Sequence, residues 1–104
     1  MLLDDVRRMA MALLGTTESP HHEYTSFRVR GRIYATAPKE GGRLHVFVDE
    51  VERDRMVRIQ PGVYERLGWG RKVVGLRVDL ARAEPEDVRA LLRTAWQRKL
   101  GRRA

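Results

Sequence analysis

The sequence predicts an α+β protein: a two-layer sandwich in which one antiparallel sheet is packed on one face by N- and C-terminal helices, with a short crossing helix. Two observations favour this fold class. Apolar residues recur at helical spacing near both ends of the chain, and the segments between are rich in β-branched and aromatic residues or alternate strictly. At 104 residues, the chain suits a single domain, 1–104, with one modest core.

The first expected element is a helix that stops at Gly15. Asp4 and Asp5 suit the positive end of the helix dipole. The apolar stripe of this helix consists of Leu3, Val6, Ala10, Leu13 and Leu14. The residues that follow, TTESPHHEY, are polar and turn-rich, and they predict a loop or a ragged edge.

Three antiparallel strands in a meander are expected next. They cover 26–29, 33–37 and 43–48, which are rich in β-branched and aromatic residues. Gly31 interrupts the first pair of strands, and the PKEGG turn interrupts the second pair.

A short crossing helix is expected after the meander. Asp49 offers an N-cap with Glu52 three residues on, a capping-box arrangement. The helix should run through about Ile59, where Pro61 and Gly62 end it.

A loop, a strand and a helix complete the expected order. Residues 63–72 are glycine-rich and predict a loop, after which VVGLRVDL alternates with its apolar residues on one face. Pro85 suits the first turn of a helix that ends at Gly101, and Trp96 lies on its apolar stripe, so we expect Trp96 in the core.

The composition points to a basic, arginine-rich protein of the cytoplasm. Lys and Arg number 21 against 14 Asp and Glu, the formal charge is +7, and only three of the basic residues are lysines. The planar donor fork of arginine suits phosphate and favours a polyanionic partner, although a high-GC genome would give the same arginine surplus. Without cysteine there is no disulfide framework, and a reducing cytoplasm fits. The N-terminus indicates neither export nor a membrane span.

Several motifs resemble one family along nearly the whole chain. The most specific are SFRV at 26–29 with GRIYA at 31–35, and LLRTAW at 91–96; an acid-Pro-His element at 18–21 accompanies them. These motifs are similar to those of the MmcQ/YjbR family. The resemblance implies a two-layer sandwich with a frataxin-like arrangement, a largely uncharacterised biochemical role, and DNA binding through loop wings. The basic pair at 71–72 departs from the pattern and leaves the start of the following strand open.

The first hairpin carries the main candidate site. It places three arginines around one glycine, in the order Arg28, Arg30, Gly31 and Arg32. With a three-residue loop at 30–32, Arg28 lies opposite Tyr34 on the outer face, where the arginines could contact phosphates and Tyr34 could stack on a base. A two-residue turn at 30–31 would instead pair Phe27 with Tyr34 and Arg28 with Ile33, which would break up this cluster. Alternatively, Arg28 and Tyr34 form a cross-strand pair that covers the exposed face.

Basic residues beside two other turns would extend this surface if those turns lie at the same end. The candidate nucleic-acid-binding residues are therefore Arg28, Arg30, Arg32, Tyr34, Lys39, Arg43, Arg71 and Lys72. The alternative function is a protein-interaction adaptor, in which the sheet and the loop around Trp69 meet an acidic protein partner. The side chain of Trp69 could cover the core as a lid, anchor a partner protein or provide a platform on which a base stacks.

The sequence carries no catalytic signature. No Ser-His-Asp order, phosphate loop or GxGxxG occurs, so we expect neither enzymatic activity nor a cofactor. A metal site is not expected either, because adjacent His21 and His22 in a strand-like segment point to opposite sides and no cysteine assists His45. The expected function is a non-enzymatic DNA- or nucleic-acid-binding module that uses basic hairpin loops.

Overall fold

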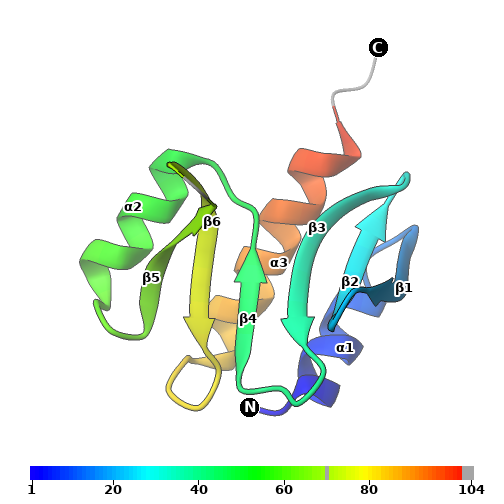
Figure 1. The fold of residues 1–104 in the computed structure, drawn as a ribbon, viewed down its shortest axis with the longest axis horizontal. Helices are drawn as coiled ribbons and strands as arrows, with labels where there is room; N and C mark the ends of the chain where they lie inside the picture. Colours follow the sequence, from blue (N-terminus) through cyan, green and yellow to red (C-terminus); the bar gives the residue numbers. More distant parts are fainter. Residues whose placement is uncertain (70, 102–104) are drawn as a thin grey trace.

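The computed structural model of the chain describes residues 1–69 and 71–101, and for Trp69 it describes the backbone alone. Along this part of the chain the helices are Leu3–Met11 (α1), Glu50–Ile59 (α2) and Pro85–Leu100 (α3) (Figure 1). The strands are Thr16–His21 (β1), Tyr24–Val29 (β2), Arg32–Pro38 (β3), Arg43–Val46 (β4), Tyr64–Trp69 (β5) and Lys72–Asp79 (β6). They form one antiparallel sheet in the order β1-β2-β3-β4-β6-β5.

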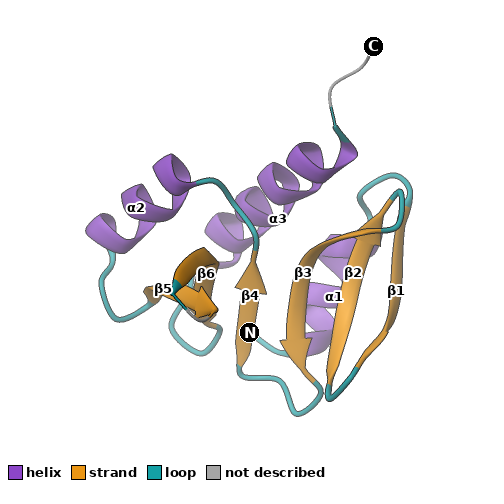
Figure 2. Cartoon of the chain, turned by 45° about the horizontal axis from the view of Figure 1, so that its top comes forward, coloured by secondary structure: helices purple, strands orange, loops and turns teal. Residues whose placement is uncertain are grey.

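The helices cover one face of this sheet, which confirms the predicted α+β sandwich (Figure 2). α3 packs on β2, β3 and β4, α1 packs on α3 and β1, and α2 packs on β5 and β6. The core fills the space between these layers, and its largest fully buried side chains include Tyr34, Tyr64, Phe27, Leu76 and Leu92. No helix in the described part of the chain is long and apolar enough to cross a membrane.

The segment TTESPHHEY is not a loop, because its first six residues form the edge strand β1, in agreement with the alternative prediction of a ragged edge. This strand pairs with β2 from Thr16, opposite Val29, to His21, opposite Tyr24. Pro20 is tolerated because an edge strand leaves one row of backbone groups unpaired. The polar composition that predicted a loop is typical of such an edge.

The predicted loop at 63–72 is also wrong, because β5 occupies most of it. β5 is the other edge of the sheet and pairs with β6, with a register shift between Leu67 and Gly68. Tyr64 is buried while Glu65 and Arg66 are exposed, so the segment offers little of the alternation that marks a half-buried strand. The start of β6, which the sequence leaves open, lies at Lys72.

The central meander and the two later helices are confirmed. β2, β3 and β4 pair in sequence order, and the side chain of Asp49 accepts a hydrogen bond from the backbone N–H of Glu52 at 2.9 Å, which caps α2. α3 begins at Pro85 as expected.

The first helix is shorter than its apolar stripe suggests. α1 ends at Met11, and Leu14 is 84% exposed although the pattern assigned it to the core. Trp96 is half-buried against the core, and its indole N–H donates to the Leu14 carbonyl at 2.8 Å. The chain leaves the helix before Gly15, which has a φ of +79°, and this turn leads directly into β1.

Candidate functional site

The β2–β3 hairpin closes through a two-residue turn, so the predicted three-residue loop at 30–32 is wrong. Arg30 and Gly31 have φ angles of 54° and 76°, and positive φ at both central residues is the requirement of a type I′ turn. Primed turns match the right-handed twist of the two strands. In the resulting register Arg28 pairs with Ile33.

Tyr34 lies on the inner face of the sheet, so the prediction that it could stack on a base is wrong. Because Arg28 and Ile33 pair on the outer face, the next residue, Tyr34, points into the core, where its ring has no exposed surface. A bulge between Phe27 and Arg28 lets Ala35 face inward as well. Its hydroxyl shares a 2.8 Å hydrogen bond with the Thr16 hydroxyl and donates to the Ala10 carbonyl at 3.4 Å. Burial raises the pKa of this hydroxyl above its usual range.

Two arginines of the hairpin lie against the C-terminal end of α3. Arg30 donates to the Leu100 carbonyl at 3.2 Å, and Arg32 donates to the Lys99 carbonyl at 3.3 Å. The last carbonyls of a helix have no intrahelical partner and carry partial negative charge, so guanidinium groups are stabilised there. We call Arg30, Arg32, Arg98 and Lys99 the upper basic cluster, because they lie at the upper end of the molecule in Figure 1.

Besides burial, the closeness of the cations in the upper basic cluster lowers the pKa of one member, Lys99. Burial, and then the charges of Arg98 and Arg32, lower the pKa of Lys99. Arg98 is fixed by a 3.0 Å hydrogen bond from its guanidinium to the Phe47 carbonyl. These cations therefore share one region although they come from α3 and from a hairpin nearly 70 residues away in the chain, since Arg30 and Leu100 are 70 positions apart.

Strand direction decides which of the other predicted residues join the upper end. Because neighbouring strands are antiparallel, β3 and β6 begin where β4 ends, so Arg71 and Lys72 lie at the same end as the β2–β3 turn. Lys39 and Arg43 flank the β3–β4 turn at the opposite end, where Arg43 lies opposite Asp79 in the register of β4 and β6. The expected basic surface is therefore divided between two ends of the sheet.

Arg28 lies at neither end of the sheet but within β2, on the outer face. Its Nε donates to the Ser26 hydroxyl at 3.0 Å, and its side chain is half-buried. It lies opposite Ile33 rather than Tyr34, so the alternative of an Arg28–Tyr34 cross-strand pair is wrong as well.

Ion pairs separate the arginines of this chain into two groups. Seven are paired with carboxylates: Arg7, Arg8, Arg53, Arg55, Arg66, Arg77 and Arg89. Among the described residues, no carboxylate lies within ion-pair distance of the upper basic cluster, of Arg71 or of Lys72. The cations of the upper end therefore form no ion pair among the described residues, although Asp49 and Glu50 line the same depression as Arg98 and Lys99.

A hollow of about 560 Å³ opens on the face of the sheet that the helices leave bare. Its volume is within the range of roughly 300–1,000 Å³ typical of ligand pockets. It is lined by His21, His22, Tyr24, Thr36, His45, Phe47, Leu67, Gly68, Val74 and Arg77. This set holds aromatic rings, one guanidinium and no carboxylate, so the described lining offers flat apolar surfaces beside a positive charge.

All three histidines of the chain line this hollow, which the sequence does not reveal. His22 has a positive φ of 59° in the β1–β2 turn, so the expectation that His21 and His22 point to opposite sides is wrong; their ring centroids are 4.8 Å apart. His45 lies on β4 with its ring centroid 5.8 Å from that of Tyr24. In the described part of the chain, no three His, Cys, Asp or Glu side chains are grouped to hold a metal ion.

His45 is the most constrained of the three. Its Nδ1 lies 3.3 Å from the Thr36 hydroxyl on the neighbouring strand, within hydrogen-bond distance. Burial lowers the pKa of the imidazole, and the positive charges of Arg77 and Arg43 lower it further. The imidazole is therefore biased toward its neutral form.

A second depression lies beside the hollow and includes two members of the upper basic cluster. It is lined by Phe47, Val48, Asp49, Glu50, Arg53, Val73, Val74, Arg98 and Lys99. Phe47 and Val74 line both depressions, so these two side chains lie between the hollow and the depression that contains Arg98 and Lys99.

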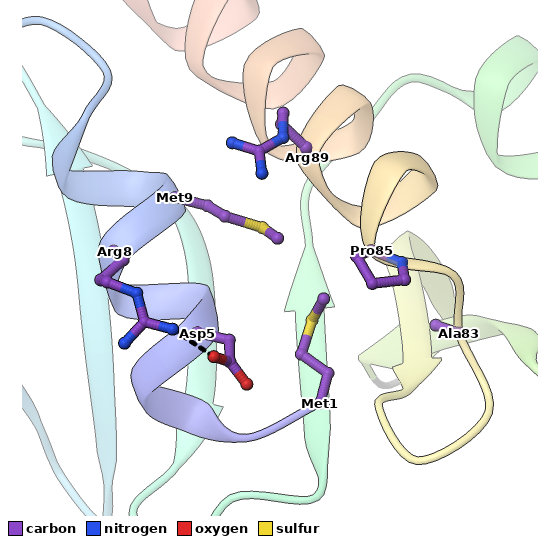
Figure 3. Close-up of a pocket in the computed structure, with 7 residues that line it drawn as sticks. All are labelled: Met1, Asp5, Arg8, Met9, Ala83, Pro85 and Arg89. Carbon is purple, nitrogen blue, oxygen red and sulfur yellow. Dashed lines mark hydrogen bonds and ion pairs between the residues drawn. The ribbon is translucent and has the colours of Figure 1, made fainter.

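A third cavity, between α1 and the start of α3, has its charged groups engaged within the protein (Figure 3). Asp5 accepts a hydrogen bond from the backbone N–H of Leu2 at 2.8 Å and forms an ion pair with Arg8; these contacts lower the pKa of its carboxyl, the backbone hydrogen bond most of all. Arg89 pairs with Glu86 at 3.5 Å. This cavity therefore presents no comparable free charge.

The predictions for Trp69 as lid, anchor or stacking platform concern a side chain outside the described residues. The candidates predicted from the sequence include Arg30 and Arg32 of the upper basic cluster, but they omit Arg98, Lys99 and the hollow. The signals available were the three histidines and Phe47, yet only the strand order brings them to one face.

One family model matches this chain. The model described as YjbR matches residues 11–98, which is most of its length. No curated protein and no solved structure matches the chain. The frataxin-like arrangement implied by the resemblance therefore stays a prediction.

Proposed function

The chain belongs to the YjbR family, and from this premise we propose that it is a non-enzymatic nucleic-acid-binding module that contacts phosphates through its upper end. The contacts come from the upper basic cluster and from Arg71 and Lys72. The single observation that carries the proposal is that these cations lie at one end of the sheet without a carboxylate at ion-pair distance among the described residues.

The chemistry of the cluster supports phosphate as the ligand. A guanidinium has five N–H donors, and Arg30 and Arg32 each spend one donor on a carbonyl, so the remaining donors are free for an oxyanion. The C-terminal end of α3 reduces the mutual repulsion of the cations without neutralising them. A phosphate at this position meets several donors that are already oriented.

The arrangement of turns agrees with the binding mode that the family resemblance implies. The β2–β3 and β5–β6 turns are two hairpin loops at the same end of the sheet, and both carry basic residues. Such loops would act as the wings proposed for DNA binding in this family. Phosphate contacts fix position and orientation but carry no sequence information, so binding would have little sequence preference.

The proposal is tested by the salt dependence of binding to a short duplex. Each neutralised phosphate contributes a slope of about −0.9 to the plot of log affinity against log salt. Replacing Arg30, Arg32 and Arg98 together by glutamine should flatten the slope by roughly two to three contacts. Fluorescence anisotropy at several salt concentrations measures this.

The matched control replaces three exposed arginines elsewhere, Arg58, Arg82 and Arg93, which also lack an ion pair among the described residues. This control removes the same charge and should change the slope little. Equal losses in both triple variants would mean that net charge alone drives binding. If wild-type protein binds no nucleic acid even at low salt, the proposal fails and an adaptor for an acidic protein partner takes its place.

A further inference from the structure

The hollow on the open face holds features that the proposed phosphate contacts do not use. Phosphate binding at the upper end requires only cations, yet the hollow gathers Tyr24, Phe47 and three imidazoles on one side of the sheet. Tyr24, Phe47 and His45 are each half-buried, so part of every ring faces the solvent on this side of the sheet. Contact with a ligand would remove this apolar surface from water. The convergence of these rings indicates a ligand with flat aromatic faces.

The backbone of β6 leaves room for Phe47, one of the lining side chains of the hollow. Gly75 lies on β6 beneath Phe47, and a Cβ at this position would come within 2.5 Å of the Val46 carbonyl oxygen and 3.1 Å of the Phe47 ring. Glycine therefore permits Phe47 to lie close over the sheet. The rings of Tyr24 and His45 form the opposite part of the lining, with their planes inclined by 54°.

The charge of the hollow favours an anionic ligand. Arg77 is its only guanidinium among the described lining residues, and its nearest carboxylate, Glu65, is 3.8 Å away and lies outside the lining. The hollow shares Phe47 and Val74 with the neighbouring depression, which contains Arg98 and Lys99 as well as Asp49 and Glu50. A polyanion bound at the upper end would therefore lie next to an aromatic recess.

We propose that the hollow binds an unpaired base of single-stranded nucleic acid, which stacks against Phe47 and the Tyr24–His45 ring pair while its phosphate contacts Arg77. This inference rests on the proposed function and narrows its substrate class to single strands. A duplex hides the faces of its bases, whereas an unpaired base can be splayed out onto aromatic side chains. The phosphates on one side of this base continue toward the upper basic cluster.

The test compares a short oligothymidylate with a duplex of the same length. Tyr24→Leu and Phe47→Leu keep apolar bulk but remove a ring, so each should weaken single-strand binding roughly fivefold or more, since base stacking is worth about 1–3 kcal/mol. Duplex binding should stay unchanged. Ile33→Ala, also on the open face but outside the hollow, is the matched control and should change neither affinity.

A second measurement uses wild-type protein and does not depend on a variant that folds. Because every histidine of the chain lines the hollow, the imidazole proton signals in an NMR spectrum report on it directly. Oligothymidylate should shift the His45 signal, and the duplex should leave it in place.

The outcomes separate the two proposals. If ring removal leaves oligothymidylate affinity unchanged and no imidazole signal moves, the hollow takes no base, although the upper basic cluster can still pass its own salt test. If the two Leu variants weaken duplex and single strand equally, selective recognition of unpaired bases is refuted. If wild-type protein binds neither nucleic acid at low salt, both proposals fail, and an acidic peptide that shifts the His45 signal would identify the alternative occupant.

Discussion

The two faces of the sheet are built from the same alternating strands, yet only one of them is filled. The inner face buries Tyr34 and Tyr64 beneath the helices with no exposed surface. The outer face carries Tyr24 and His45 around a hollow that no described element covers. The same residue types serve stability on one face and remain available for a ligand on the other. The difference shows that the covering helices, rather than side-chain type, separate core from site.

The largest test of this comparison is Tyr34→Ala on the filled face. Removing a fully buried ring should lower the free energy of unfolding by about 3–5 kcal/mol. Tyr34→Phe keeps the ring and loses the hydrogen bond to Thr16, so it should cost about 1 kcal/mol. Urea denaturation measures both. A loss below about 1 kcal/mol for Tyr34→Ala would contradict the position of this ring.

Gly75→Ala tests how closely β4 approaches β6 at Gly75. The added Cβ would lie 2.5 Å from the Val46 carbonyl oxygen, so β4 and β6 must separate, and we expect a loss of about 1–3 kcal/mol in the free energy of unfolding. Gly68→Ala is the matched control, because its Cβ would meet only the Lys72 carbonyl oxygen at 3.6 Å, an ordinary contact. Similar losses in both variants, measured by urea denaturation, would show that strand glycines are costly to replace for a general reason.

Tyr64→Phe sharpens the comparison within the filled face. The Tyr64 hydroxyl is buried and has no hydrogen-bond partner among the described residues, and burial raises its pKa to about 12. Removing it relieves the cost of burying an unpaired polar group, so the free energy of unfolding should stay constant or rise by up to about 1 kcal/mol. Thermal and urea unfolding of Tyr64→Phe beside Tyr34→Phe measure the contrast. A clear loss of stability in Tyr64→Phe would mean that its hydroxyl has a partner.

The smallest expected effect is a pH dependence that arises on the open face. Burial, Arg77 and Arg43 lower the pKa of His45 in the folded protein, so the unfolded state binds more protons than the folded state just below the ordinary value of about 6.5. Stability should therefore fall as the pH drops from about 6.5 to the folded pKa of His45. His45→Gln should remove this part of the dependence.

The other lowered pKa values do not interfere with this measurement. The carboxyls of Glu18, Asp5 and Asp54 also titrate lower in the folded protein, chiefly because of hydrogen bonds to Arg7, to the Leu2 backbone and to Arg53, and they act below about pH 4.5. Urea denaturation between about pH 5 and about pH 7 isolates the histidine contribution. An unchanged pH dependence in His45→Gln would place the effect on another group.

The local pattern of the sequence was sufficient for the central elements. Alternation in β6, the β-branched meander and the cap at Asp49 are signals within a few residues, and each predicted its element correctly. β1 and β5 escaped prediction because edge strands bury little and need no alternation. The identity of Arg30 and Arg32 as hairpin-tip residues was also readable, whereas the burial of Tyr34 depended on the length of the turn, which the sequence left open between two and three residues.

The sequence by itself determined the α+β class, the helices, the inner strands and the excess of arginine. The tertiary structure alone decided which arginines share one end, because that depends on strand order and on contacts such as Arg32 with Lys99, 67 residues apart. It likewise brought His21, His22 and His45 to one hollow. Local patterns encode the burial of each residue, but a site on a sheet is assembled from neighbours that are distant in the chain, and their register is settled only when the whole sheet forms.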